Sequence, residues 1–266
     1  MTFERWLDEA DRVLVAAGAG LSAAAGYDYS DTERFAELFP ALHRRGLRAR
    51  YQLIGLPLPP ALLWGYWSVH VDDIRFGEEP NPVYARLRER VGPRDHFVLT
   101  SNVDGLFARN GFAEERVWTP QGDYGRYQCE TPCTRETWPS RPVVEAALAA
   151  CDAATGETSA VPSCPRCGGP VFLNVHKGPE YVPDHHLPAG RRLRDWLDDS
   201  AGKGLLAIEI GAGWSTPGVV RRPVEQIVRA LPGARLVRVN RDHAEVPGDL
   251  AGRALALRAG VADVIA

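Results

Sequence analysis

The sequence of 266 residues has few lysines and no long apolar segment. Lys177 and Lys203 are its only lysines, so arginine supplies nearly all of the 31 basic side chains. These are offset by 34 acidic side chains, and the net charge of −3 does not indicate a nucleic-acid partner or an acidic membrane surface. No stretch of about 20 apolar residues is present to cross a membrane.

The chain also shows no secretory signal at its start. Its first residues, MTFERWLDEADR, are charged and contain no long apolar run. We therefore expect a cytoplasmic location, where cysteines stay reduced. In that compartment the five cysteines are expected to be metal ligands or free thiols.

Compact apolar runs alternate with helical patterns and predict an α/β fold. Apolar runs without polar alternation are typical of parallel strands buried on both faces. We therefore expect a doubly wound, Rossmann-like parallel sheet. Strands are predicted at 12–17, 96–100, 205–211 and 234–240, helices at 21–25, 32–45, 60–76, 81–91 and 219–231, and a last strand and helix within 254–265.

Residues 119–185 differ from the rest because they are rich in Pro, Gly, Cys and Thr. Few long apolar runs occur there, so we expect a small insertion held by something other than a core. Cys129 and Cys133 are separated by three residues, and Cys164 and Cys167 by two. Two such pairs predict a tetrahedral zinc site, and with no histidine or open position beside them the metal is expected to be structural.

The remaining candidates for metal binding are weaker. Cys151 lies outside both pairs and is expected to be a small buried hydrophobe. His176, His185 and His186 could suggest a second metal, but we favour surface histidines.

The segment VLVAAGAGLSAAAG (13–26) places Gly18, Gly20 and Ala23 directly after a predicted strand. This G-x-G-x-x-A spacing lets the backbone approach a pyrophosphate, although a packed glycine turn explains it as well. A dehydrogenase would carry an acidic residue at the end of the next strand, about 20 positions later. The polar stretch 27–34 follows instead, which weakens that interpretation.

Polar side chains follow two other predicted strands. Asn102 and Asp104 come after 96–100, where they could hold a ribose or a carboxamide, or cap a helix. Gly211, Ala212 and Gly213 end the strand at 205–211 and suit the other half of a nucleotide, or simply a capped helix start. Asn240, after the next strand, could contact a ribose or occupy a turn.

Together these stretches resemble the sirtuins, which are NAD-consuming protein deacylases and ADP-ribosyltransferases. GAGLSAAAG is similar to the family's glycine-serine loop, TSNVDGLF to its Thr-Gln-Asn-Ile-Asp-Gly-Leu-His motif, and the cysteine pairs to its zinc ribbon. GAGWSTP and VRVN resemble its later adenosine-contacting loops. The motifs occur in the family's order from about residue 13 to residue 265.

The chain departs from deacylating sirtuins at two places. Residues 27–31 read Tyr-Asp-Tyr-Ser-Asp where those enzymes carry Asp-Phe-Arg, and Gln121 stands where they carry the histidine of a His-Gly pair. The details SNVDGLF, QGDYGRYQC and GWSTPGVVRRP resemble the macrodomain-linked bacterial branch. That resemblance implies protein mono-ADP-ribosylation, with a lipoylated carrier protein as the type of acceptor and a functional link to a macrodomain protein.

The resemblance also implies the cofactors and the site. NAD is the expected co-substrate, zinc is expected on Cys129, Cys133, Cys164 and Cys167, and catalytic roles fall to Asn102, Asp104 and Gln121. The residues implied for NAD binding are Gly18, Ala19, Gly20, Ser22, Gly26, Tyr29, Ser101, Asn102, Asp104, Gln121, Gly211, Ala212, Gly213, Asn240 and Arg241.

We expect a Rossmann-like domain over 1–34, 77–123 and 177–266, and a smaller discontinuous domain. The smaller domain is expected to combine a helical module over 35–76 with a zinc-ribbon module over 124–176. By the resemblance, NAD is expected in the cleft between the two domains.

Gln121 helps to decide between the two expected reactions, deacylation and ADP-ribosyl transfer. In deacylation a histidine takes a proton from a ribose hydroxyl, and glutamine cannot titrate in this range. Glutamine can still position a hydroxyl or a nucleophile by hydrogen bonds. Direct ADP-ribosyl transfer omits the hydroxyl activation, so Gln121 favours transfer. The alternatives are an unusual deacylase, an NAD hydrolase, and a non-catalytic NAD-binding interaction module.

Overall fold

The computed structural model describes residues 2–77 and 79–265. The chain divides into two compact units. One comprises Met1–Gly26, Pro80–Gly122 and His186–Ala266, and we call it the sheet unit. The other comprises Tyr27–Glu79 and Asp123–His185, and we call it the ribbon unit.

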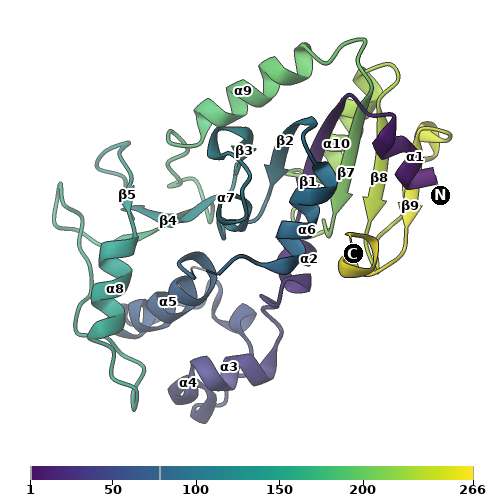
Figure 1. Cartoon of the computed structure of the whole chain (residues 1–266). Helices are drawn as coiled ribbons and strands as arrows, with labels where there is room; N and C mark the ends of the chain where they lie inside the picture. The colour runs from purple at the N-terminus through teal and green to yellow at the C-terminus, as the bar shows by residue number, and fades with distance from the viewer. Residues whose placement is uncertain (1, 78, 266) are drawn as a thin grey trace. The chain divides into compact units, whose positions relative to one another are not determined.

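A six-stranded parallel sheet forms the centre of the sheet unit (Figure 1). Its strand order is β3-β2-β1-β7-β8-β9, and every neighbouring pair is parallel. The predicted parallel sheet is confirmed. The strands are β1 (Arg12–Ala17), β2 (Asp95–Thr100), β3 (Val117–Trp118), β7 (Leu205–Ile210), β8 (Arg235–Val239) and β9 (Ala254–Leu257).

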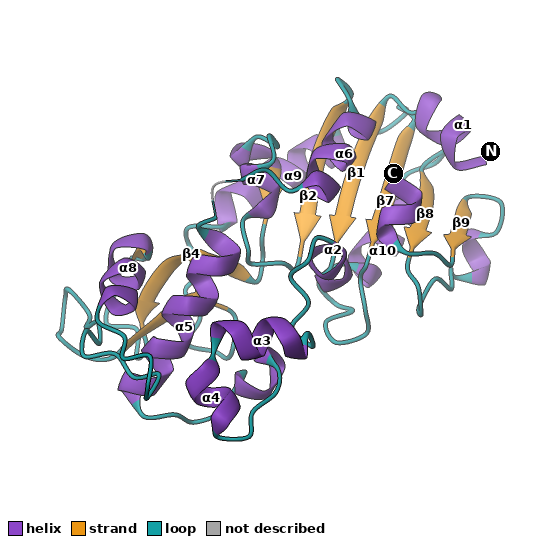
Figure 2. Ribbon diagram, turned by 60° about the horizontal axis from the view of Figure 1, so that its bottom comes forward, coloured by secondary structure: helices purple, strands orange, loops and turns teal. Residues whose placement is uncertain are grey.

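Helices cover both faces of this sheet (Figure 2). On one face, α9 (Leu187–Asp198) and α10 (Arg221–Ala230) pack on a core that includes Leu14, Phe97 and Leu236. On the other face, α11 (Val261–Ile265) contacts α2 (Ala19–Ala24) and α6 (Pro82–Val91). The remaining helical segments of the unit are α1 (Thr2–Asp8), α7 (Leu106–Arg109), η2 (Glu114–Arg116) and η3 (Gly248–Leu250).

The ribbon unit combines a small sheet with helices. The sheet has the order β5-β4-β6, with β4 (Gly122–Cys129), β5 (Trp138–Pro139) and β6 (Val171–Val175). The helices are α3 (Thr32–Leu38), α4 (Pro40–Arg44), α5 (Pro60–Arg75) and α8 (Arg141–Ala149), with the short η1 (Arg50–Leu53). The helix α5 packs on α8, and its aromatic side chains fill the interior; for example, the Tyr66 ring lies 4.9 Å from that of Phe39.

One helix prediction was wrong, and some helices were not predicted. The single helix expected over 32–45 is divided at Phe39, because Pro40 disfavours a helical residue before it and starts α4 instead. The helices α8, within the expected small insertion, and α9 were not predicted.

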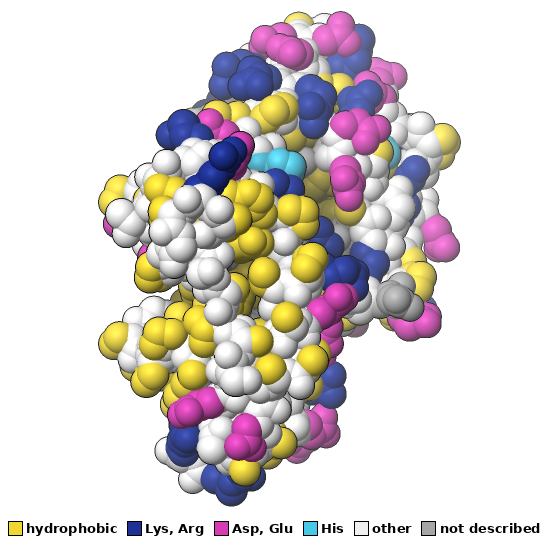
Figure 3. Space-filling model, turned by 90° about the vertical axis from the view of Figure 1, so that its left-hand side faces the viewer, with side chains coloured by type: hydrophobic (Ala, Val, Ile, Leu, Met, Phe, Trp, Pro, Cys, Tyr) yellow, Lys and Arg dark blue, Asp and Glu magenta, His cyan; other side chains and the backbone are white. Residues whose placement is uncertain are grey.

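On the surface that Figure 3 shows, charges of both signs lie mainly toward the top, the bottom and the right-hand side, and hydrophobic side chains occupy much of the middle. Basic side chains are dark blue there, acidic ones magenta and hydrophobic ones yellow. Within the described part of the chain, no helix is both long and apolar enough to cross a membrane.

Candidate functional site

The first strand-end loop of the sheet unit packs directly on a second one. β1 leads into Gly18, which precedes Ala19, the first residue of α2. The Gly18 N–H donates to the Ile210 carbonyl oxygen over 3.0 Å, and the Gly20 N–H donates to that of Gly211 over 2.9 Å. The loops after β1 and β7 are therefore joined backbone to backbone.

This packing explains why the loops are made of glycine. A Cβ atom on Gly18 would lie 2.7 Å from the Ala212 Cα, and one on Gly20 would lie 2.8 Å from the Gly211 Cα. Gly211 has φ +62°, and a Cβ there would lie 2.5 Å from the backbone nitrogen of Leu21. The packed glycine turn weighed as an alternative for the first loop is therefore present, and the second loop packs closely against it. This close packing is compatible with a ligand bound over the two loops.

The loop after β2 is hydrogen-bonded to the end of β1 and to the glycine loop that follows it. The Asn102 amide nitrogen Nδ2 donates to the Gly18 carbonyl oxygen over 3.1 Å. The hydroxyl of Thr100 accepts from the Asn102 N–H over 3.0 Å and donates to the Ala17 carbonyl oxygen over 3.0 Å. Asn102 is buried, so its side chain has a fixed position at the carboxyl end of the sheet.

Asp104 belongs to a buried polar cluster with α2 and α6. The Ser22 hydroxyl donates to Asp104 Oδ2 over 2.5 Å, and the Tyr84 hydroxyl lies 3.3 Å from that of Ser22. Burial raises the pKa of Tyr84 well above its usual value, and the Asp104 charge adds to this, so the phenol stays neutral. Asp104 Oδ1 also accepts from the Leu106 N–H over 3.0 Å, in the turn before α7, whose N-cap is Gly105 and not one of the two residues weighed for that role.

The loop after β7 is fixed to the loop after β8 through one carbonyl. The Ala212 oxygen accepts from Arg221 Nη1 over 2.9 Å and from Asn240 Nδ2 over 3.0 Å. Asn240 Oδ1 accepts from the N–H groups of Asp242 and His243, so this residue does occupy a turn. Arg221 was not singled out in the sequence, since an arginine at a helix start gives no sign that it is 1% exposed.

Beneath these loops lies a buried ion network. Arg238 donates to both oxygens of Glu209, over 2.7 and 2.8 Å, and also reaches Glu225 over 2.8 Å. Burial raises the pKa of Glu209 in spite of these arginine contacts. The pair keeps the ends of β7 and β8 in register below Ala212.

The other predicted residues of the sheet unit lie around these loops. The Ser101 N–H donates to the Ala17 carbonyl oxygen over 3.1 Å, and Gly26 follows α2 at φ +91°. Gly213 and Arg241 are exposed in the loops after β7 and β8. Gln121 is half-buried between β3 and β4, one residue before the sheet unit ends at Gly122.

Tyr29 lies in the ribbon unit rather than with the other predicted NAD-binding residues. Its hydroxyl is 3.3 Å from that of Tyr124, and its ring meets the fully buried His70 edge-on at 5.1 Å. The pKa of His70 is held well below its usual value by burial and by Arg50, so its imidazole is neutral.

The four paired cysteines come together in the ribbon unit. Cys129 Sγ lies 3.7 Å from Cys167 Sγ, Cys133 Sγ lies 3.6 Å from Cys164 Sγ, and all four sulfurs lie within 4.8 Å of one another. Zinc–sulfur bonds of about 2.3 Å in a tetrahedron require sulfur separations of roughly 3.8 Å. The cluster therefore fits zinc, as predicted, and these separations are too long for disulfides.

The three histidines considered as ligands of a second metal differ in their burial. His176 and His185 are exposed, as expected. His186 is buried before α9 with its Nδ1 3.2 Å from the Thr119 hydroxyl, so the prediction of a surface residue was wrong there. In the part of the chain that is described, the four cysteines are the one metal-type cluster found.

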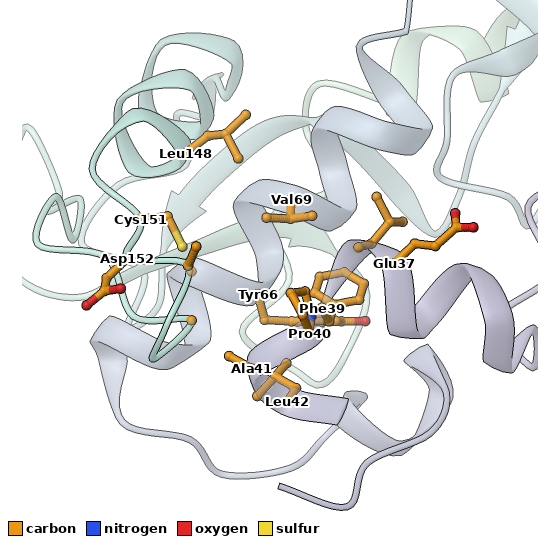
Figure 4. Close-up of a pocket in the computed structure, with 14 residues that line it drawn as sticks. Glu37, Phe39, Pro40, Ala41, Leu42, Tyr66, Val69, Leu148, Cys151 and Asp152 are labelled. Atoms are coloured by element: carbon orange, nitrogen blue, oxygen red, sulfur yellow. The ribbon is translucent and has the colours of Figure 1, made fainter. Parts of the chain in front are cut away.

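A cavity of about 300 Å³ lies within the ribbon unit and contains none of the predicted site residues (Figure 4). Phe39, Tyr66, Val69 and Leu148 give it apolar walls. Cys151 lines it and is half-buried, less enclosed than the buried hydrophobe expected. Burial raises the pKa of this thiol, and Asp152 adds to the effect, so Cys151 is not set up as a nucleophile.

Solved structures of known proteins have the same fold as this chain. The structure matches a Sir2 homologue solved in complex with ADP-ribose at a TM-score of 0.63, with 20% identity, over 99% of this chain and 92% of that one. The chain has the sirtuin fold. The predicted resemblance to the sirtuins is thereby confirmed, although no protein-family model matches the chain.

Two curated relatives of this chain are named for ADP-ribosyl transfer. A probable bifunctional ADP-ribose hydrolase/ADP-ribosyltransferase of Fusarium oxysporum is 36% identical over 245 residues, which are 88% of this chain. A protein ADP-ribosyltransferase of Staphylococcus aureus is 26% identical over 97% of this chain and 83% of that protein. The chain spans 41% of the length of the Fusarium relative.

Proposed function

We propose that the chain is an NAD-dependent protein mono-ADP-ribosyltransferase of the sirtuin type, which releases nicotinamide and joins ADP-ribose to a protein. The observation that carries this proposal is the similarity to two relatives named for ADP-ribosyl transfer. Gln121 supports it, because the resemblance puts a histidine base at this position in deacylating sirtuins.

In the transfer, the bond between the ribose C1′ and nicotinamide breaks, and its electron pair leaves with nicotinamide. A nucleophile of the acceptor then forms the new bond to C1′. Asn102 and Asp104 are the groups that we assign to orienting the reacting end. Their hydrogen bonds to Gly18 and Ser22 support the assignment, because side chains held in advance need little reorganisation.

The rest of the nucleotide is assigned to the strand-end loops. We assign the pyrophosphate to the backbone at Gly18–Gly20, with Ser22, and the adenosine half to residues 211–213 and 240–241. The interlocked backbones of these loops support the assignment, since they form one rigid surface at the carboxyl ends of parallel strands, where open α/β sheets bind ligands. Gly26, Tyr29 and Ser101 complete the proposed set.

Gln121 is proposed to position a ribose hydroxyl or the incoming nucleophile by hydrogen bonding. A carboxylate acceptor is already ionised at neutral pH and needs no base. For deacylation, losing a general base costs about 10²–10⁴ in rate. Zinc on the four cysteines is assigned a structural role, since four protein thiolates fill its coordination sphere.

A lipoylated carrier protein is the acceptor that we infer, from the resemblance to the macrodomain-linked branch. From the same resemblance we infer a functional link to a macrodomain protein, and we propose that this partner is an ADP-ribose hydrolase. The Fusarium relative supports it, because its name joins hydrolase and transferase activities in one longer protein. We also infer a cytoplasmic location, where the four clustered cysteines would stay reduced.

The proposal is tested with NAD labelled in the adenylate half, offering a lipoylated carrier protein and an acetylated peptide separately. Transfer predicts nicotinamide release with label retained on the carrier and an unchanged peptide. Peptide deacetylation without labelled protein would instead identify a deacylase. Nicotinamide release with the label only in free ADP-ribose would identify a hydrolase, and NAD binding without release a non-catalytic module.

The Asn102→Ala variant tests the assigned site. Transfer is expected to fall by about 10² or more, because misplacing the reacting groups by about 1 Å has an effect of this size. Thermal unfolding and NAD binding are measured in parallel to separate loss of catalysis from loss of fold. Transfer at the full wild-type rate would show that the role given to Asn102 is wrong.

A further inference from the structure

A second cavity lies in the sheet unit, at the opposite end of β2 from Asn102. Its volume is about 250 Å³, and its lining residues are Arg88, Arg94, Asp95, His96, Gly111, Ala113 and Arg116. Because β2 starts at Asp95 and Asn102 follows its last residue, this cavity is at the amino-terminal edge of the sheet. It is separate from the strand-end loops assigned to the nucleotide.

Three guanidinium groups from three different segments line this small space. Arg88 comes from α6, Arg94 precedes β2, and Arg116 ends η2. Arg88 is held in place by donating to the carbonyl oxygens of Gly111 and Gly92, over 3.2 and 2.6 Å. Like charges that are held together repel, so the arrangement favours a bound anion.

The carboxylates nearby offset the charge of the three arginines only in part. Asp95 Oδ2 accepts from Trp196 Nε1 over 2.9 Å and lies 3.0 Å from Nε of a fourth arginine, Arg12. Its other oxygen is 3.3 Å from Arg116. Arg94 comes within 3.5 Å of Asp8, whose side chain is 78% exposed, so solvent screens that pair.

His96 contributes a buried nitrogen that has no protein partner among the described residues. Its Nδ1 is 2.8 Å from the Arg94 carbonyl oxygen, which can only accept, so Nδ1 carries the proton. Nε2 is buried and makes no hydrogen bond to the described protein atoms. Burial holds the pKa of His96 below its usual value, and Arg88 and Arg116 lower it further while Asp95 opposes them.

We infer that this cavity is a binding site for a phosphate-type oxyanion. Guanidinium groups present planar forks of N–H donors that match phosphate oxygens. An anion would offset the repulsion among the arginines. It would also favour the protonated, positively charged form of His96, which lines the same cavity.

Sulfate is the first probe, because its charge is constant between pH 5 and 8. Its binding is followed by NMR through the Cε1 proton of His96, identified with the His96→Gln variant. We expect a saturable shift and an affinity that rises at least threefold as the pH falls from 8 to 6, because binding is linked to proton uptake at His96. A shift that does not saturate would overturn the proposal.

The Arg116→Gln variant tests whether the cavity itself binds the anion. Arg116 has one ion pair, with Asp95, and a half-exposed side chain, so its loss should leave the fold intact. We expect at least a fivefold loss of sulfate affinity, and no change in Arg191→Gln, which removes an exposed arginine from α9. Equal loss in both variants would show a non-specific effect of charge, and no loss in Arg116→Gln would show that sulfate does not bind in this cavity.

Inorganic phosphate and ribose 5-phosphate then separate two sources of the same group. Tighter binding of ribose 5-phosphate would indicate a phosphorylated metabolite, and equal binding would indicate free phosphate. If neither inorganic phosphate nor ribose 5-phosphate binds saturably, the proposed site is wrong. These measurements need no NAD, so their result is independent of the proposed transferase activity.

Discussion

The sheet unit and the ribbon unit are held together in different ways. In the sheet unit, β1 and β7 are buried along their whole length, and helices pack on both faces. In the ribbon unit, β5 has only two residues, and the strand β4 ends in a cysteine of the four-sulfur cluster. The difference indicates that apolar burial stabilises the first unit, whereas the second depends on a metal for the part around its cysteines.

Removing one zinc ligand should have the largest effect. Structural zinc contributes about 10–16 kcal/mol of binding free energy in small zinc-finger peptides. We expect Cys164→Ser to lose zinc and to lose amide-exchange protection in β4 and β6, while β1 and β7 stay protected. Cys151→Ser, outside the cluster, should keep both metal and protection. Full protection in metal-free Cys164→Ser would show that the ribbon does not need zinc.

The next largest effect is expected from the buried ions of the sheet unit. Arg238→Met leaves Glu209, which is fully buried, without its bidentate partner. The loss of one partner of a buried pair costs about 3–5 kcal/mol. Urea unfolding measures this cost, and the double variant Glu209→Gln/Arg238→Met should recover most of it. Equal instability of the double variant would point to packing rather than charge.

A smaller effect should follow from adding one methyl group between the glycine loops. Gly211→Ala introduces a clash with the Leu21 backbone at a positive φ, and overpacking of this kind costs about 1–3 kcal/mol. Gly213→Ala is the matched control, because nothing lies within 4 Å of its added Cβ. If the two variants have equal free energies of unfolding, the close packing between the two glycine loops is contradicted.

The smallest effect is expected at the surface of the ribbon unit. Arg135 forms an ion pair with Asp184, and its side chain is 70% exposed. Exposed pairs contribute little because water and salt screen them. Arg135→Gln should leave the urea midpoint unchanged within error at low and high salt, and a clear loss at low salt would show that this pair matters.

Much of the sheet unit could be predicted because its signals are local. Continuous apolar runs placed β1, β2, β7 and β8 to within about a residue, and amphipathic spacing placed α6. The ribbon unit was harder to predict, because its order comes from ligands that are distant in sequence. The helix α8 was missed although it carries local signals, a proline in its first turn and Val144 and Ala147 buried at helical spacing. The break at Phe39 was missed although Pro40 disfavours a helical residue before it.

In the candidate site, the sequence indicated which residues to examine but not how they connect. The contact of Gly18 and Gly20 with Gly211 joins loops almost 200 positions apart, which no local pattern reveals. Tyr84 and Arg221 were missed because on a helix they look like ordinary amphipathic positions. The cysteine cluster was foreseen, since ligand spacing is a chemical signature that does not depend on the surrounding fold.

The most direct test of the account compares the wild type with Gln121→His, in a single assay that contains labelled NAD, the lipoylated carrier and an acetylated peptide. If Gln121 suits transfer, the wild type will label the carrier and leave the peptide acetylated. The histidine variant is expected to lose part of the transfer and to gain measurable deacetylation. Deacetylation by the wild type, with no label on the carrier, would contradict the proposed function.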